Sequence, residues 1–355
     1  MKKTSSLKWI FSFLCLLLAI VLLLSTVAFI VDPFMQFRVK DNTYMLNGRY
    51  VCSGLIRNYD YNTLILGSSM IQNFNMDQFR QDLGVAPLHI GLGGLTITEM
   101  CDLLTLAYDA QKADSYYVCI DLMVFTNNLE QKHLPQHLMN RDLLSTLRYL
   151  LSYEVWFGFL PIDIAFMTLD QLGINLPTKF AYSRSIDNLE NWQLDYPVWG
   201  EKTVLDNYKN NQYSVSYVDS ENLYQTAIAN IDKLFNAFNF TKGEHIFFFP
   251  PYSSLCWSEY ENRGQFNTYL KIKRYFIEKA MQYDVTVYDF QSAEFTMDLD
   301  NYKDSTHYMA HINDWMVQCF VDKSYVVNND NVLDFEKTLM ENTQKFREKY
   351  ADLFN

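Results

Sequence analysis

Thr63-Leu64-Ile65-Leu66-Gly67-Ser68-Ser69 is a short apolar run closed by a glycine and two serines. An apolar run of about four to eight residues between turn signals is typical of a buried strand. The glycine and serines that follow predict a tight turn. We therefore expect a first strand at 63–66 whose carboxyl end presents Ser68 and Ser69.

The same pattern returns four times further along the chain. Short apolar runs at 87–90, 116–120, 245–249 and 285–288 predict further strands. Helical patterns lie between them: a capping box at Thr96-Ile97-Thr98-Glu99, apolar residues at helical spacing from Leu223 to Phe238, and helices near 269–282 and after 308–310. Strands that alternate with helices favour a parallel sheet with helices on both faces. The predicted fold class is α/β, a three-layer α/β/α sandwich with a parallel sheet.

The N-terminal region carries a membrane signal. No charged residue occurs from Trp9 to Val31, and at ~1.5 Å per residue this run crosses a ~30 Å hydrocarbon core. A secretory signal is the alternative, with cleavage near Ser25-Thr26-Val27-Ala28, but its apolar region is usually only about 7–15 residues. Lysines precede the run, and basic flanks stay cytoplasmic. We expect a cytoplasmic N-terminus at 1–8, one transmembrane helix at 9–31, and the main domain outside the cytoplasm.

The outer part of the chain has a predicted order of segments. Asp32-Pro33 ends the first helix, and 32–60 is expected to be a polar, tyrosine-bearing approach segment. The sheet domain is expected at 61–322, with an insertion at about 125–217 that is rich in Trp and Tyr and covers one end of the sheet. A C-terminal loop and helix follow at 323–355, with the helix from Asp334 to Phe354 packed on the outside.

The net charge argues against one class of partner, and the cysteine content argues against a disulfide framework. The chain has 29 basic and 41 acidic side chains and a formal charge of −12, which disfavours nucleic acid as a partner because phosphate binding needs a basic face. Cys15 lies in the apolar run, and an odd number of cysteines without a close pairing motif lies beyond it. No disulfide is expected. Cys101 and Cys119 are expected to be small buried hydrophobic residues.

A complete hydrolytic set lies at the predicted strand ends, where ligands of open parallel sheets bind. A serine hydroxyl becomes a nucleophile when a histidine takes its proton and a carboxylate orients that histidine. Ser69, His307 and Asp304 fit these roles, and the Asp304-x-x-His307 spacing lets one loop present both side chains. The backbone N–H groups of Ser69 and of Gly91 or Gly93 can converge on a developing oxyanion.

Structural alternatives exist for each of these residues. Ser68 and Ser69 can cap the following helix, and His307 can be a structural histidine bonded to Asp304. Asp304, His307 and His311 also have a spacing that suits a metal, whereas His133 and His137 are separated by Pro135. No metal or cofactor is expected. Tyr252, in Pro250-Pro251-Tyr252-Ser253, is expected to contact substrate or to form a rigid turn.

These motifs resemble those of the SGNH (GDSL-like) hydrolase superfamily, whose fold is flavodoxin-like. Within it the chain is similar to the membrane-anchored envelope proteins of teichoic-acid D-alanylation and polysaccharide O-acetylation. The family's Gly-(Asp/Ser/Thr)-Ser block matches Gly67-Ser68-Ser69, its oxyanion glycine matches Gly91 or Gly93, and its Asp-x-x-His block matches Asp304 and His307. The match covers about residues 60 to 322, apart from the insertion.

One block of the family is absent. Asp121-Leu122-Met123-Val124-Phe125-Thr126-Asn127-Asn128 stands where the family has Gly-x-Asn-Asp, so Asn127 or Asn128 is the candidate side-chain oxyanion donor and substrate contact. The resemblance implies a serine esterase or O-acyltransferase that acts on an acylated envelope polymer or acyl donor, with a multi-spanning membrane O-acyltransferase as partner. The alternatives are a non-catalytic SGNH-fold scaffold that binds glycan or the acyltransferase, and a metal-dependent hydrolase.

Overall fold

The structure is a computed structural model that describes residues 3–40, 47–126, 134–174, 186–188, 199–211 and 219–354. The chain divides into two compact units. One joins Met1–Tyr59 to Leu134–Ile186, and the other joins Asp60–His133 to Asp187–Asn355. The short turn η4 (Ile186–Asn188) falls where the chain passes from the first unit to the second.

The second unit holds a five-stranded sheet of order β2-β1-β3-β4-β5, in which every pairing is parallel. This confirms the α/β class and the parallel sheet, and each predicted strand is present to within about one residue. The strands are β1 (Thr63–Gly67), β2 (Pro87–Gly91), β3 (Ser115–Cys119), β4 (Glu244–Phe249) and β5 (Thr286–Asp289).

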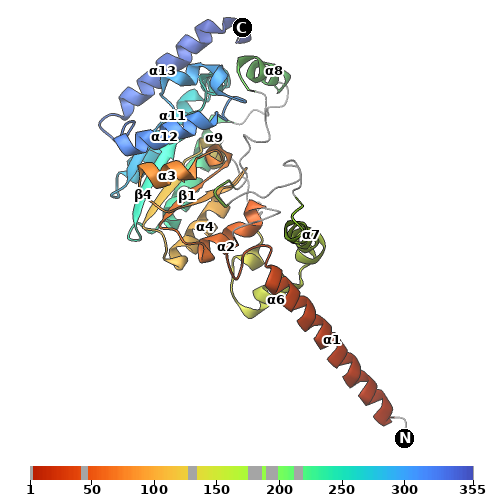
Figure 1. Ribbon diagram of the computed structural model, residues 1–355. Helices are drawn as coiled ribbons and strands as arrows, with labels where there is room; N and C mark the ends of the chain where they lie inside the picture. The colour runs from red at the N-terminus through yellow and green to blue at the C-terminus, as the bar shows by residue number, and fades with distance from the viewer. Residues whose placement is uncertain are drawn as a thin grey trace. The chain divides into compact units, whose positions relative to one another are not determined.

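Helices and short turns connect and cover these strands (Figure 1). The predicted capping box is confirmed, because Thr96 and Glu99 bond each other's backbone N–H groups at the start of α4. The elements of this unit are η1 (Ser69–Ile71), α3 (Met76–Asp82), α4 (Ile97–Ala110), α5 (Leu122–Thr126), α8 (Glu201–Asn211), α9 (Ser220–Ala237), α10 (Ser254–Asn262), α11 (Phe266–Ala280), η7 (Glu294–Met297), η8 (Leu299–Asn301), α12 (Ala310–Asp322), α13 (Val332–Lys349) and η9 (Ala351–Leu353).

Alternate side chains of the strands contact different helices, as the period of two in a strand requires. Tyr117 of β3 and Phe248 of β4 lie 5.1 and 5.5 Å, between ring centroids, from Phe320 of α12. Phe247, the neighbour of Phe248, lies 5.4 Å from Phe276 of α11 instead. Continuous apolar strands are therefore buried on both sides, which explains why they show no apolar/polar alternation in the sequence.

The first unit is helical. It contains α1 (Lys3–Val31), α2 (Gly48–Asn58), η2 (Gln136–Leu138), α6 (Leu143–Leu151), the π-helical turn η3 (Glu154–Phe159) and α7 (Leu160–Gln171). Within α1, Ser6–Val31 is long and apolar enough to cross a membrane, and the same holds by length and composition for Leu143–Leu169. The first of these was expected from the sequence, and the second was not.

The approach segment expected at 32–60 contains in its second half a helix that was not predicted, α2. Val51, Cys52, Leu55 and Ile56 are buried at helical spacing. Two glycines, at the start and within the helix, lower its intrinsic helix propensity and obscure this pattern. Gly54 is required there, since an added Cβ would lie 2.4 Å from the carbonyl oxygen of Phe34.

The expected insertion at 125–217 is not a single body. Residues 134–186 belong to the unit that contains α1, whereas α8 belongs to the sheet unit. The C-terminal helix, expected from Asp334, begins at Val332 and packs against α10. All six cysteines are free thiols. Cys119 is buried as expected, but Cys101 is only half-buried.

Candidate active site

The candidate nucleophile stands directly beyond the carboxyl end of β1. Gly67 ends the strand against Cys119 of β3, and an added Cβ there would lie 2.6 Å from the Cys119 Cβ. Ser68 then has an extended backbone and caps η1 by accepting from the Met70 N–H. Ser69 is the first residue of that turn. The capping role considered for both serines therefore falls to Ser68, and the Ser69 hydroxyl has a different partner.

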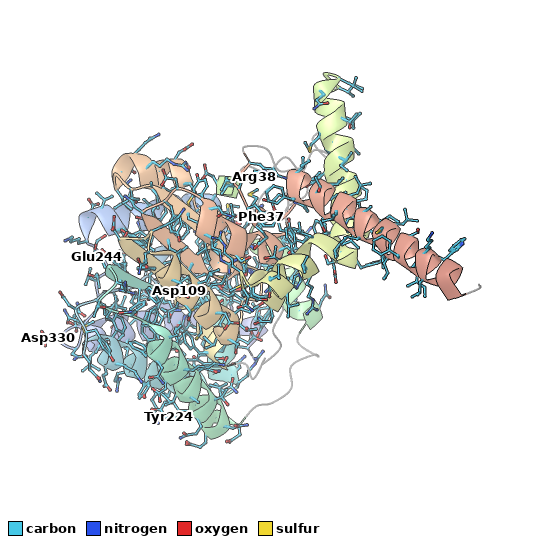
Figure 2. All side chains as sticks on the ribbon, turned by 90° about the horizontal axis from the view of Figure 1, so that it is seen from below. Phe37, Arg38, Asp109, Tyr224, Glu244 and Asp330 are labelled. Atoms are coloured by element: carbon cyan, nitrogen blue, oxygen red, sulfur yellow. The ribbon has the colours of Figure 1, made fainter. Side chains whose placement is uncertain are left out.

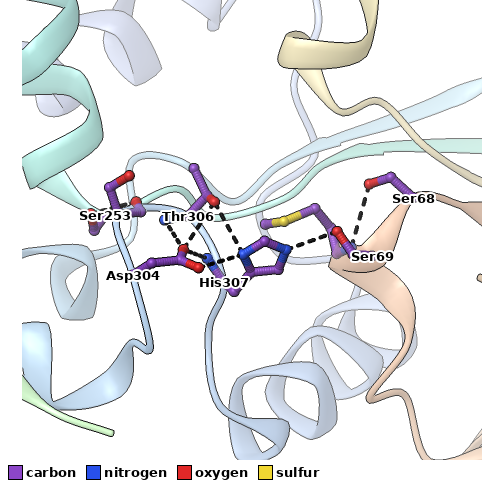
Figure 3. Close-up of polar contacts among 8 residues, drawn as sticks. Ser68, Ser69, Ser253, Asp304, Thr306 and His307 are labelled. Atoms are coloured by element: carbon purple, nitrogen blue, oxygen red, sulfur yellow. Dashed lines mark hydrogen bonds and ion pairs between the residues drawn. The ribbon is translucent and has the colours of Figure 1, made fainter. Parts of the chain in front are cut away.

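Ser69, His307 and Asp304 form a continuous chain of hydrogen bonds (Figure 3). The Ser69 Oγ lies 2.8 Å from the Nε2 of His307. The Nδ1 of His307 lies 2.8 Å from the Oδ2 of Asp304. The imidazole ring thus lies between the Ser69 hydroxyl and the Asp304 carboxylate, with one ring nitrogen in contact with each. The structure brings together the three residues that the sequence proposed as nucleophile, base and orienting acid.

The environment of Asp304 keeps it ionised. Its Oδ1 accepts from the backbone N–H groups of Thr306, at 2.9 Å, and His307, at 2.8 Å, and from the Thr306 hydroxyl, at 3.1 Å. Burial by itself raises the pKa of this carboxyl group. The hydrogen bonds and the charge of His307, with the bonds from the two backbone groups, outweigh burial and lower the pKa of Asp304 to about 2.

The loop that carries Asp304 and His307 is fixed on both sides. Residues Tyr302 and Tyr308 pair across it as an antiparallel bridge, and the Lys303 N–H donates to the His307 carbonyl at 3.0 Å. The Ser253 hydroxyl and N–H both donate to the Ser305 carbonyl, at 2.6 and 3.1 Å. The buried Tyr308 hydroxyl donates to the Met70 carbonyl at 2.6 Å, which joins this loop to the turn that carries the nucleophile.

A buried carboxylate behind the nucleophile was not recognised in the sequence as part of the site. Asp121, just past β3, accepts from the Ser68 hydroxyl at 2.7 Å, from the Met123 N–H at 3.1 Å and from the Tyr252 hydroxyl. Burial and the Asp121 charge raise the pKa of Tyr252 well above its usual value. The Tyr252 hydroxyl therefore stays protonated and donates. In the sequence, the position of Asp121 just after a predicted strand was the only sign that it belongs to the site.

The glycines predicted to contact an oxyanion differ in accessibility, and the predicted asparagines lie outside the described residues. Gly91 is buried at the end of β2, and its carbonyl accepts from the Gln72 amide at 3.1 Å. Gly93 is half-exposed, and an added Cβ would meet only the Gln72 amide nitrogen, at 3.7 Å. Gly93 is thus the more accessible of the two glycines. Asn127 and its neighbour Asn128 lie outside the described residues.

Two further expectations concern Tyr252 and a metal. Tyr252 was expected to contact substrate or to form a rigid turn; its side chain is fully buried against Asp121 and offers no surface to a ligand, so of the two alternatives only the turn remains. The metal alternative grouped Asp304, His307 and His311, but the His311 Nε2 lies 3.2 Å from the Asn301 Oδ1. Within the described ranges, no three His, Cys, Asp or Glu side chains are arranged to hold a metal ion. His133 lies outside those ranges.

The geometry permits one clear chemical operation. A hydroxyl in contact with an imidazole nitrogen can transfer its proton there, while a carboxylate on the opposite nitrogen stabilises the resulting imidazolium. Comparison of the chain with protein-family models and with curated proteins found no match. The interpretation of this site therefore depends on its residues and their geometry.

Proposed function

We propose that this chain is a membrane-anchored serine esterase or O-acyltransferase of the SGNH (GDSL-like) type that acts on acyl groups of a cell-envelope polysaccharide or teichoic acid. The observation that carries the proposal is the chain of 2.8 Å contacts from Ser69 through His307 to Asp304, at the carboxyl end of β1. As part of the same proposal, the sheet and its helices form the three-layer α/β/α sandwich of that superfamily. The order of the motifs along the chain supports this assignment.

In the proposed mechanism, the Ser69 Oγ attacks the acyl carbonyl carbon while the His307 Nε2 takes the hydroxyl proton. Asp304, held ionised by its hydrogen bonds, stabilises the imidazolium that forms. Collapse of the tetrahedral intermediate breaks the ester bond, and His307 returns the proton to the leaving alcohol. The acyl-enzyme then passes its acyl group to water in an esterase, or to a sugar hydroxyl in a transferase, with His307 again acting as base.

Backbone donors stabilise the oxyanion in this proposal. The N–H of Ser69 is one, and Gly93, the more accessible of the two candidate glycines, supplies the other. Asp121 is ruled out as a donor, because its carboxylate accepts from three groups. A preorganised donor contributes roughly 10²–10³-fold to the rate in acyl-transfer enzymes.

The proposed location follows from α1 and its flanks. Three lysines precede Trp9, so the N-terminus is cytoplasmic and the chain beyond Val31 lies outside, with α1 as a single-pass anchor. The similarity to envelope proteins of D-alanylation and O-acetylation supplies the partner class: a multi-spanning membrane O-acyltransferase that delivers acyl groups. The acceptor or donor is the acylated polymer, and nucleic acid is no partner.

The test uses the purified full chain in detergent micelles, with a fluorophosphonate probe and a small chromogenic acetyl ester. We expect labelling and ester cleavage in the native chain, and loss of both in Ser69→Ala. Ser220→Ala, at the first residue of α9, is the matched control and retains both. Labelling that persists in Ser69→Ala overturns the assignment of the nucleophile.

A folded native chain that neither labels nor turns over favours the non-catalytic scaffold instead. One observation supports that alternative. At the end of β3, where the family carries a side-chain oxyanion donor, this chain has Asp121, which accepts hydrogen bonds. The scaffold predicts that Ser69→Ala leaves the cellular phenotype unchanged. The hydrolase predicts that this substitution abolishes it.

A further inference from the structure

The first unit has an exposed apolar surface that takes no part in the proposed reaction. The helices α6 and α7 and the turn between them expose large apolar side chains along most of their length. Leu144 is 77% exposed and Phe157 is 72% exposed, and the rings of Tyr153 and Phe157 stack 4.9 Å apart. We define the α6–α7 face as the exposed residues Leu143, Leu144, Leu147, Leu151, Tyr153, Phe157 and Ile164.

We propose that the α6–α7 face is embedded in the outer leaflet of the bilayer that α1 crosses. The occupant of this face is lipid, the same lipid that surrounds α1. The inference takes from the proposal above only that α1 spans a membrane, and it is independent of the hydrolase chemistry.

The place where α6 and α7 pack on α1 supports this depth. Along α1, the side chains of residues 6–20 are exposed, whereas the half-buried Val21 and Leu24 and the buried Ala28 and Val31 form a stripe at helical spacing. Both α6 and α7 contact α1, and α6 lies beside its C-terminal end (Figure 1). Since α1 rises ~1.5 Å per residue, the stripe extends about 15 Å back along the helix axis. That length is about half of a ~30 Å hydrocarbon core, so the packed helices share the depth of the outer leaflet.

A buried polar contact fixes α6 at the end of α1. Asp32, the first residue after α1, accepts from the Tyr149 hydroxyl of α6 at 2.7 Å and from three backbone N–H groups of residues 36–38. The Arg38 guanidinium donates to the carbonyls of Phe29 and Ile30 in the last turn of α1. Figure 2 shows Phe37 and Arg38 at this end of α1. The α6–α7 face therefore keeps a fixed position along α1.

The sheet topology excludes a second crossing by this segment. Residues 143–169 lie between β3 and β4 in the sequence, and these two strands pair in one sheet with Ser115 opposite Glu244. A single crossing would place the paired strands on opposite sides of the membrane. Apart from α1, no other described helix is long and apolar enough to return the chain. Ser152, with φ −70° and ψ 149°, also ends α6, which at ~1.5 Å per residue is only about 14 Å long.

The charges and aromatic rings of the face suit an interfacial position. Arg148 and Glu154 are exposed beside the apolar residues, and a long arginine side chain can reach the headgroups while its stem remains among acyl chains. Tyr153 and Phe157, with Trp156 between them, form the kind of aromatic group that is enriched at membrane interfaces. At this depth beside α1, the face meets the lipid that surrounds α1. A protein partner would have to displace that lipid to cover the same area.

The experiment measures the accessibility of spin labels on the full chain in phosphatidylcholine nanodiscs. Labels are placed singly at Leu144→Cys and Phe157→Cys in a background with Cys15→Ser and Cys101→Ser, because the other cysteines are buried. Leu333→Cys on α13 is the matched control, an apolar residue that is 63% exposed in the other unit. A label on native Cys15 provides the bilayer reference.

At positions 144 and 157 we expect collisions with oxygen, which concentrates in hydrocarbon, to exceed those with a water-soluble nickel chelate, as at Cys15. At position 333 the nickel chelate should dominate. Nickel access at 144 and 157 equal to that at 333 overturns the proposal. Protection from both reagents also overturns it and indicates that protein covers the face. A Cys15 label open to nickel removes the premise that α1 spans the bilayer. Fluorophosphonate labelling of the same samples reports separately on Ser69.

Discussion

Replacing Asp304 by asparagine changes the tautomer of the proposed base and little else. Asparagine has the shape of aspartate, so its Oδ1 can still accept from the N–H groups of Thr306 and His307. Its amide nitrogen then stands where the carboxylate Oδ2 now lies, 2.8 Å from the His307 Nδ1. Two donors cannot share that contact, so Nδ1 becomes the acceptor and the ring proton moves to Nε2. The nitrogen that faces Ser69 loses the lone pair needed to take the hydroxyl proton.

The size of the effect follows from that tautomer. The same substitution in a serine-protease triad lowers kcat by about 10⁴-fold while the geometry remains intact, which corresponds to about 5.5 kcal/mol of transition-state stabilisation. Stability should change far less. The Asp304 side chain is 34% exposed and the bonds to its Oδ1 survive, so we expect Asp304→Asn to cost no more than about 2.5 kcal/mol.

The assay compares second-order rate constants for fluorophosphonate labelling at neutral pH, with unfolding by urea measured in parallel. Asp298→Asn is the matched control, since Asp298 caps the adjacent turn η8 by accepting from the Asp300 N–H at 3.0 Å. We expect the control to label as the native chain does. If Asp304→Asn labels within tenfold of the native rate while Ser69→Ala does not label, Asp304 does not orient the base and the argument fails.

Three further predictions concern stability, and urea unfolding tests each of them. Asp121→Asn places an amide donor against one of the two hydroxyls that now donate, that of Ser68 or that of Tyr252, and should cost about 1–3 kcal/mol; an unchanged midpoint would contradict the assigned hydrogen bonds. The Lys273 Nζ lies 2.7 Å from the Asp289 Oδ2, and both side chains are only 1% exposed. Lys273→Met removes the partner of the buried Asp289 carboxylate and should cost about 3–5 kcal/mol of unfolding free energy. The added change Asp289→Leu should recover most of that loss, and no recovery would refute the pairing. Because the pKa of Asp304 is lowered to about 2, below the ~3.9 of an unfolded chain, the ionised carboxylate stabilises the fold fully above pH ~4. The difference in unfolding free energy between the native chain and Asp304→Asn should shrink as the pH falls from 4 toward 2, and a difference independent of pH would be inconsistent with that pKa.

The strands and the three residues of the hydrogen-bonded chain could be found from the sequence because their signals are local. A buried parallel strand is a short apolar run between turn residues, and each run could be identified without knowledge of its neighbours. Ser69 and His307 lie 238 residues apart. Their meeting could nevertheless be expected, because the carboxyl ends of parallel strands share one edge of the sheet.

The contacts that were missed depend on long-range packing. The Tyr308–Met70 bond and the contact of Asp121 with Ser68 join segments whose separation in space the sequence does not record. The helix α2 was hidden by its glycines, one of which is there because the Phe34 backbone passes too close for a side chain. The division of the insertion was hidden for a similar reason, since an apolar helix looks the same in sequence whether protein or lipid covers it.

The acceptor role of Asp121 bears on how fast the proposed enzyme can be. With its carboxylate accepting from Ser68, Tyr252 and Met123, Asp121 does not donate to the oxyanion, and one missing donor lowers kcat by roughly 10²–10³-fold. An enzyme fixed to the surface that carries its polymer can tolerate this loss, because tethering raises the effective substrate concentration into the millimolar range. Turnover of soluble esters should accordingly be slow, and the natural reaction should gain its rate from the anchor that holds site and polymer at one surface.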